Sequence, residues 1–300
     1  MLLFLKGMFM GIANIIPGVS GGTIALITEI YRPFISSLKR LNLRALKLLL
    51  GGRFKALYTA VNGSFLVPIF SGIVVSVVGL ANLLRWSFEN YPVIIWSLFF
   101  GIISASVYYI GRGVKKWDRT AILFAALGLG VSIGFDYLPA VPENHNLIYI
   151  FLCGMVSISG MTLPGVSGSF LLILMGNYQL LLIDSIAHFN ALYVSIFAAG
   201  SVAGLVGFSY VLVWLLEHYN DEVMGALTGF VLGSLLIIWP WQEPINWVES
   251  DGERFVLQYR RFLPQTLGPR DYAGLATMIL GAMGLILLEY FAGSQKKQDS

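Results

Sequence analysis

The sequence predicts an all-α polytopic membrane protein built as an inverted repeat, in which each half is a re-entrant helical hairpin followed by three transmembrane helices. Three observations lead to this prediction. Of the 300 residues, 57% are hydrophobic and only 12% are charged, whereas a soluble domain carries about 25% charged residues. The apolar residues come in runs of about 20, the length of helix that crosses ~30 Å of hydrocarbon. A short glycine-rich motif also occurs twice, each time inside an apolar stretch.

Six apolar segments are long enough to span a bilayer. They lie at roughly residues 65–84, 92–111, 120–138, 191–216, 223–239 and 272–291. Two further stretches, residues 2–35 and 147–183, are interrupted near their middles by proline and clustered glycine, which stop helices. The first of them is apolar for only about 15 residues before its interruption, or ~22 Å of helix. Each stretch is therefore predicted to form two half-helices, a re-entrant hairpin that enters the membrane and returns to the same side.

The two hairpins are predicted to be copies of each other. Residues 17–21 and 164–168 both read Pro-Gly-Val-Ser-Gly, 147 positions apart. Further identities keep the order of the copies: Tyr31 with Tyr178, Asn62 with Asn190, Gly72 with Gly200, and Gly101 with Gly233. The odd number of crossings in each half turns the second copy upside down. We expect a first repeat over residues 1–138, a second over 147–291 and a cytoplasmic tail over 292–300.

The basic residues predict the orientation. Seven Lys or Arg and no acidic residue lie between Arg32 and Lys55. Placing this segment, both termini and the loop at 112–119 in the cytoplasm collects 14 of the 19 basic residues there, as the positive-inside rule requires. The protein is thus expected in the cytoplasmic membrane. One loop, Glu217–Glu222, disagrees, because it has three acidic residues and no Lys or Arg.

Residues 36–57 have a separate expected role. They interleave leucine with lysine and arginine, a pattern typical of an amphipathic helix that lies on an anionic leaflet. Anionic membrane lipids are therefore an expected partner.

The residues at the two breaks are typical of an anion site. Transporters built from inverted repeats bind substrate at such breaks, where helix N-termini offer N–H donors and glycine lets an anion approach the backbone. The candidate substrate-binding residues are Asn14, Pro17, Gly18, Ser20, Gly21, Gly22, Thr23, Pro164, Gly165, Ser167, Gly168 and Ser169. Glu29 and Asp136 are candidates for coupling transport to an ion.

A structural interpretation of the breaks stays open beside the functional one. Pro-Gly sequences also kink helices, and Ser and Gly also let helices pack closely. No nucleophile elbow, phosphate-binding loop of an ATPase or zinc-protease motif is present. No catalytic residue, metal ion, cofactor or nucleic-acid partner is therefore expected.

Residues 7–26 (GMFMGIANIIPGVSGGTIAL) resemble the signature of the PopT family of polyprenyl-phosphate transporters, long described as a domain of unknown function. Residues 164–169 (PGVSGS), 233–235 and 239–241 are similar to it as well, so the resemblance covers nearly the whole chain. It implies a flippase that returns undecaprenyl phosphate from the outer to the inner leaflet for reuse in cell-envelope synthesis. Glu29 and Arg32 depart from the small residue and the acid expected at their positions, which leaves their roles open.

The expected mechanism is alternating access around two phosphate sites. Inward movement of an anion opposes an inside-negative potential by ~2.3 kcal/mol per charge at ~100 mV, which predicts coupling to a proton or sodium ion. Two alternatives remain: a channel or secondary carrier for a small soluble anion, and a membrane enzyme that acts on lipid phosphates. The sequence does not determine the oligomeric state.

Overall fold

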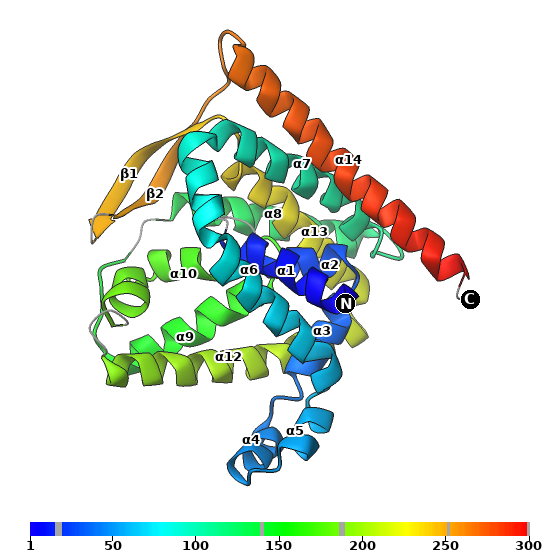
Figure 1. Ribbon diagram of the computed structural model, residues 1–300, viewed down its shortest axis with the longest axis vertical. Helices are drawn as coiled ribbons and strands as arrows, with labels where there is room; N and C mark the ends of the chain where they lie inside the picture. Colours follow the sequence, from blue (N-terminus) through cyan, green and yellow to red (C-terminus); the bar gives the residue numbers. More distant parts are fainter. Residues whose placement is uncertain (16–19, 139–140, 186–189, 251–252, 299–300) are drawn as a thin grey trace.

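The computed structural model describes residues 1–15, 20–138, 141–185, 190–250 and 253–298, and these are mostly helical (Figure 1). Six long helices coincide with the predicted spans: α6 (Gly63–Asn90), α7 (Pro92–Gly111), α8 (Arg119–Tyr137), α12 (Ala191–His218), α13 (Asn220–Ile237) and α14 (Pro269–Gln298). Four stretches of the described residues are long and apolar enough to cross a membrane: Gly63–Leu80, Pro92–Gly111, Ala191–His218 and Pro269–Leu287. The protein is therefore a mostly helical, multi-pass membrane protein.

Both predicted interruptions break a helix. The first lies between α1 (Leu2–Ile15) and α2 (Gly21–Ile27), and the second between α9 (Leu147–Thr162) and α10 (Gly168–Leu174). Each second arm is shorter than predicted, because α2 and α10 end well before residues 35 and 183.

A left-handed residue ends each of these second arms. Glu29 has φ 58° and Gly176 has φ 70°, a conformation that stops an α-helix at its C-terminus. The chain continues as α3 (Tyr31–Leu38) after the first arm and as the π-helix η1 (Gln179–Asp184) after the second. Glu29 and Gly176 lie 147 positions apart, the offset of the two breaks.

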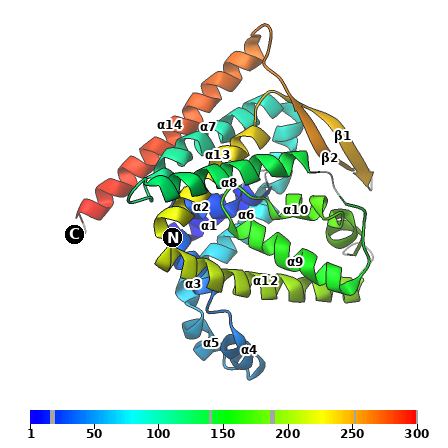
Figure 2. The same cartoon turned by 180° about the vertical axis from the view of Figure 1, so that it is seen from behind.

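The long helices pack in pairs: α1 on α6, α9 on α12, α7 on α14 and α8 on α13 (Figures 1 and 2). In the first two pairs, four glycines lie so close to a backbone carbonyl that a Cβ would clash with it. These contacts are Gly7 on Ile69, Gly72 on Phe4, Gly154 on Phe197 and Gly200 on Phe151. Such contacts let helix backbones approach closely within a membrane. The last two contacts repeat the first two at the offsets of 147 and 128 found in the sequence.

The basic segment forms two short helices instead of the single helix expected over residues 36–57. α4 (Leu43–Leu50) and α5 (Phe54–Ala60) project from the bundle as an arm between α3 and α6 (Figure 1). Gly52, with φ +66°, separates them. A glycine in the left-handed region ends a helix, so the amphipathic pattern cannot continue as one element.

The acidic first turn of α13 lies against the basic loop between α7 and α8. Asp221 accepts hydrogen bonds from the backbone amides of Lys115 and Lys116, both at 3.0 Å. Arg32 at the start of α3 donates to the side chain of Asn220. The bond from the Lys115 amide is the largest of the interactions that lower the pKa of Asp221. These acidic residues depart from the positive-inside pattern, and one of them, Asp221, accepts hydrogen bonds from backbone amides of the neighbouring basic loop.

A two-stranded antiparallel sheet, which the all-α prediction did not include, occupies part of the region between α13 and α14. It is formed by β1 (Gln242–Ser250) and β2 (Glu253–Arg261). Glu243 and Arg260 face each other across the two strands and form an ion pair at 2.9 Å.

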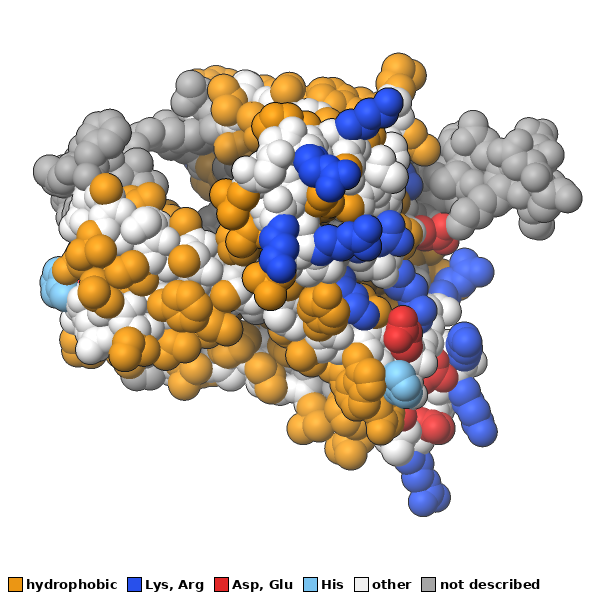
Figure 3. All heavy atoms as spheres, turned by 90° about the horizontal axis from the view of Figure 1, so that it is seen from below, with side chains coloured by type: hydrophobic (Ala, Val, Ile, Leu, Met, Phe, Trp, Pro, Cys, Tyr) orange, Lys and Arg blue, Asp and Glu red, His pale blue; other side chains and the backbone are white. Residues whose placement is uncertain are grey.

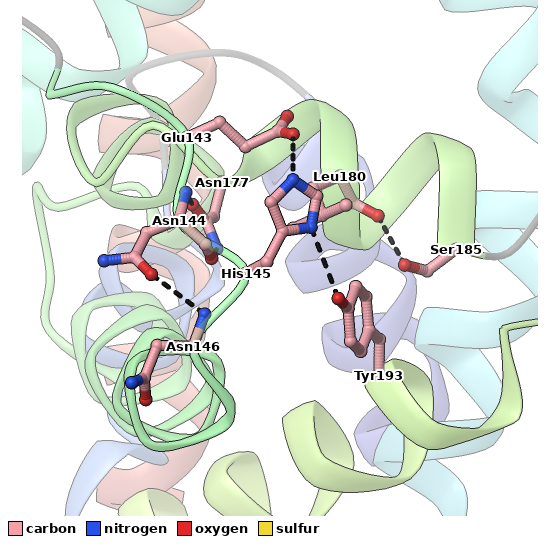
Figure 4. Close-up of polar contacts among 8 residues, drawn as sticks. All are labelled: Glu143, Asn144, His145, Asn146, Asn177, Leu180, Ser185 and Tyr193. Atoms are coloured by element: carbon pink, nitrogen blue, oxygen red, sulfur yellow. Dashed lines mark hydrogen bonds and ion pairs between the residues drawn. The ribbon is translucent and has the colours of Figure 1, made fainter.

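The segment that precedes α9 ties α10 to α12 (Figure 4). The fully buried Asn177, just beyond α10, accepts from the amide of Asn144 at 2.9 Å and donates to its carbonyl at 2.8 Å. His145 lies between Glu143, at 3.1 Å, and the hydroxyl of Tyr193 on α12, at 3.3 Å. These contacts fix the far end of the second half-helix against α12.

Candidate functional site

The tip of the first half-helix is capped by side chains of its own hairpin. Ser20 is the N-cap of α2, and its Oγ accepts from the amide of Gly22 at 3.0 Å. Asn14, near the end of α1, accepts from the amide of Gly21 at 2.7 Å. The N–H groups that a helix start leaves unpaired are thus already used here. The sequence led us to expect them free for a ligand, and at this tip the structure differs.

The two breaks contact each other directly. The Oγ1 of Thr23 accepts from the amide of Gly165 at 3.0 Å, and the Tyr31 hydroxyl donates to the carbonyl of Thr162 at 3.2 Å. Gly165 has φ +79°, and a Cβ there would lie 2.7 Å from the carbonyl oxygen of Phe230 on α13. Only glycine fits this position. Segments more than a hundred residues apart therefore form one polar junction inside the bundle.

Ser20, the N-cap of α2, makes a third contact between the hairpins. The Oγ of Ser20 donates to the carbonyl of Met161 at 2.9 Å. Because Ser20 is almost fully buried, this hydrogen bond satisfies a carbonyl at the end of α9 that has no partner within its own helix.

The tip of the second half-helix is less completely paired. Ser167 is the N-cap of α10; its Oγ accepts from Phe170 at a long 3.5 Å and lies 2.9 Å from the Oγ of Ser169. Ser157 on α9 donates to the carbonyl of Gly168 at 3.0 Å. Among the described residues, the amides of Gly168 and Ser169 donate no hydrogen bond. This tip, unlike the first, keeps donors available.

A cavity of about 250 Å³ lies beside this junction, walled by α1, α9, α10, η1, α12 and both N-caps. Its polar lining residues are Asn14, Ser20, Ser157, Ser167, Ser169 and Ser201. Its other lining residues are Ile158, Met161, Val166, Gly168, Leu172, Leu182 and Phe197. None of the described lining residues is charged. Such a cavity offers an anion the carboxamide of Asn14, the amides at the start of α10 and one hydroxyl of the Ser167–Ser169 pair, without a fixed counter-charge.

The structure brings most of the predicted site residues to this place. Five of them line the cavity: Asn14, Ser20, Ser167, Gly168 and Ser169. Five others are buried around it or in the junction: Gly21, Gly22, Thr23, Pro164 and Gly165. Pro17 and Gly18 lie outside the described residues.

Two polar lining residues escaped the sequence analysis. Ser157 and Ser201 lie within the uninterrupted helices α9 and α12, where the only signal was a hydroxyl inside an apolar run. The two coupling candidates are not placed in the cavity: Glu29 is exposed beyond the far end of α2, and the side chain of Asp136 lies outside the described part of the chain.

Comparison with known proteins identifies the family. Residues 10–255 match the family model described as undecaprenyl phosphate translocase-like. The chain is 37% identical over 296 residues to a polyprenyl-phosphate transporter of Vibrio cholerae serotype O1, with 96% of each chain covered. It is 29% identical over 253 residues to a polyprenyl-phosphate transporter of Staphylococcus aureus, with 79% of this chain and 85% of the relative covered. No solved structure matches the chain. The chain belongs to the undecaprenyl phosphate translocase-like family.

Proposed function

We propose that this protein is a transporter of undecaprenyl or a related polyprenyl phosphate, and that the phosphate head group passes through the cavity at the paired helix breaks. One observation supports this above all others. Caps from both breaks line a single cavity that has six polar lining residues, in a chain that is 37% identical to a protein named polyprenyl-phosphate transporter.

The lining suits a phosphate head group. Moving an ionised group into an apolar medium costs tens of kcal/mol in the idealised limit, and each hydrogen bond to a charged group returns ~1.5–3 kcal/mol. Several such bonds are therefore needed, and in this proposal they come from Asn14, from the Ser167–Ser169 hydroxyl pair and from the amides of Gly168 and Ser169. At about 250 Å³ it is smaller than the ~300 Å³ of the smallest usual ligand pockets. The head group fits this space, and the prenyl chain stays in the lipid.

The two hairpins have different roles in this proposal. α2 and α10 are each only 7 residues long, so their dipoles add at most ~1–2 kcal/mol. The amides at the start of α2 are already paired with Asn14 and Ser20. We therefore propose that the second break makes most of the hydrogen bonds to the head group, and that the first break stabilises the junction.

The direction that we propose is from the outer to the inner leaflet, by alternating access of two inverted repeats. The repeated glycine contacts of α1 on α6 and of α9 on α12 support the duplication. The remaining pairs support it too, because α7 packs on α14 while its counterpart α13 packs on α8. The two halves thus exchange their last helices, and in the proposed cycle each half moves against the other.

We further propose that the phosphate is carried in its protonated, singly charged form. Inward movement of each negative charge opposes a membrane potential of ~100 mV by ~2.3 kcal/mol, and no described lining residue carries a positive charge. A pH gradient should therefore drive uptake in vesicles, while a sodium gradient leaves it unchanged. Uptake that ignores the pH gradient, or that requires sodium, would contradict this coupling.

The function is tested with the purified full chain in vesicles loaded with a short-chain polyprenyl phosphate. The expected result is movement of the lipid phosphate between leaflets, with no movement of the matching polyprenol and no competition by inorganic phosphate. Competition by inorganic phosphate, without dependence on the prenyl chain, would instead identify a carrier of small anions. Release of free phosphate from the lipid would identify an enzyme.

A further inference from the structure

The arm of α4 and α5 exposes large apolar side chains that the proposed transport does not use. Leu43 is 76% exposed, Leu50 is 79% exposed and Phe54 is 66% exposed. Leu46 and Leu49 are each 48% exposed. Apolar surface of this kind on a projecting element marks a contact with another apolar phase.

The apolar and basic side chains of α4 lie on adjoining faces. Leu43, Leu46 and Leu50 follow the i, i+3, i+7 spacing of one helical stripe. Arg44 and Lys47 flank that stripe and are exposed. The small residue Ala45, on another face, is the buried one.

The charge of the surrounding segment has a single sign. Seven Lys or Arg lie between Arg32 and Lys55, and no acidic residue occurs between Glu29 and Glu89. Figure 3 views the molecule from the side of the arm and shows Lys and Arg side chains gathered among apolar ones on this face. The surface is therefore complementary to a negatively charged one.

The arm stands where a span enters the bilayer. α5 ends at Ala60, and the span candidate Gly63–Leu80 begins three residues later. Gly63 packs on the ring of Tyr58 so closely that a Cβ would clash, which fixes this junction. At the base of the arm, the Nζ of Lys39 lies 4.9 Å from the ring centroid of Tyr210 on α12. The exposed leucines are thus held beside the boundary of the hydrocarbon.

We propose that the arm is a binding surface for anionic phospholipids in the leaflet at which α6 begins. The leucine stripe enters the acyl-chain boundary, and the Lys and Arg side chains pair with the phosphate head groups. Both contributions are those by which amphipathic helices bind anionic membranes. The entry point of α6 favours a lipid surface over a soluble partner or a second copy of the chain.

The test places a fluorescent probe on the stripe. Cys153 is the only cysteine of the chain, so the variant Cys153→Ser with Leu46→Cys accepts an environment-sensitive fluorophore at one position. The labelled full chain is placed in phosphatidylcholine vesicles with or without phosphatidylglycerol. We expect a blue shift and protection from an aqueous quencher only in the vesicles with phosphatidylglycerol, and loss of both in high salt, which screens charges.

Two triple variants, which each remove three positive charges, distinguish the effect of the arm on lipid binding from the effect of other basic residues at this end of the molecule. The first variant removes three charges from the arm by Arg44→Gln, Lys47→Gln and Arg53→Gln. Each basic residue near an anionic surface raises the binding constant about fivefold, so the equilibrium constant for insertion of the arm should fall about 100-fold. The control variant removes three charges from the α7–α8 loop and the start of α8 by Lys115→Gln, Lys116→Gln and Arg119→Gln. It should leave the fluorescence unchanged. In that control variant, Asp221 still accepts hydrogen bonds from the backbone amides of the loop, so the loop keeps its structure.

Three results would overturn the proposal. The first is an equal blue shift in vesicles without phosphatidylglycerol, and the second is an equal loss in both triple variants. The third is self-quenching of the labelled chain in detergent that is relieved when unlabelled chain is added. This result would identify a second copy of the chain as the occupant. Equal thermal unfolding midpoints of the two triple variants show that neither result comes from misfolding.

Discussion

Ser201 and Ser195 both lie on α12, and each donates a hydrogen bond of 2.9 Å to its own helix, to the carbonyls of Phe197 and Leu192 respectively. Only Ser201 lines the cavity. Ser201→Ala therefore removes a hydroxyl that can turn from the carbonyl of Phe197 to the head group, without removing a bond between helices. Since a hydrogen bond to a charged group contributes ~1.5–3 kcal/mol, transport at low lipid concentration should fall about tenfold or more. Ser195→Ala is the control, and equal rates in the two variants would exclude a role for Ser201.

Glu29 stands in a backbone conformation that favours glycine. Its φ is 58°, and its counterpart in the second hairpin is Gly176. A non-glycine residue in the left-handed region costs roughly 1 kcal/mol, so Glu29→Gly should raise the unfolding midpoint by a few degrees in detergent. The variant also tests the coupling role predicted from the sequence. Because Glu29 does not line the cavity, we expect the dependence of transport on the pH gradient to persist; its loss would restore Glu29 as the coupling residue.

Asp221 makes stability depend on pH. Hydrogen bonds, first of all from the Lys115 amide, lower its pKa in the folded state. A carboxyl with a lowered pKa stabilises the fold above its unfolded pKa of about 3.9, and this contribution is lost as the pH falls through the folded value. Asp221→Asn should therefore lower the unfolding midpoint near neutral pH, and the difference from the unchanged protein should shrink in acid. A difference that does not vary with pH would contradict this origin.

The sequence identifies the residues of the breaks well but not their pairing. The repeated motif placed Ser20, Ser167 and Ser169 at the site from local pattern alone. The closure of the first tip depends on Asn14, whose carboxamide reaches the α2 amide only once α1 and α2 lie against each other. Ser201 enters the cavity from a helix far away in the sequence, a relation that no local pattern encodes.

At the scale of elements, Thr23 joins the two half-helix tips. Thr23→Val keeps the shape of the side chain but leaves the buried amide of Gly165 without its acceptor. A buried donor without a partner costs ~1–3 kcal/mol, so the unfolding midpoint should fall by several degrees. Thr59→Val on α5 is the matched control, because Thr59 is exposed and bonds only within its own helix, to Lys55. Equal midpoints in the two variants would show that the junction does not stabilise the fold.

The positions of the long helices were predictable, and the ends of the short elements were not. A span of α6 or α12 is dictated by hydrophobicity over about 20 residues, and neighbouring helices change it little. The ends of α2 and α10 are instead set by single left-handed residues. The β1–β2 hairpin was missed because Pro244 and the mixed charges of its strands hide the alternation that predicts a strand.

At the scale of the whole molecule, the pairing of helices is where sequence and structure agree most closely. The offsets of 147 and 128 were derived from identities such as Gly72 with Gly200, and the same residues make equivalent backbone contacts in space. A side chain larger than glycine would separate the helices at such a crossing, which is why the proposed duplication would keep its identities there. The exchange of α14 and α8 between the halves could not be predicted, because apolar helices of equal length have no preferred partner in the sequence.

The central claim is that the head group of the lipid occupies the cavity between the breaks, and labelling of a cysteine in the cavity tests it most directly. In the Cys153→Ser background, Ser201→Cys places the only thiol in the lining. Its rate of reaction with a small thiosulfonate reagent is measured with a polyprenyl phosphate and with the matching polyprenol. At a concentration about tenfold above its Kd, the lipid phosphate should slow labelling about tenfold, while the alcohol leaves the rate unchanged. Equal protection by both lipids, or protection by neither, would contradict the account.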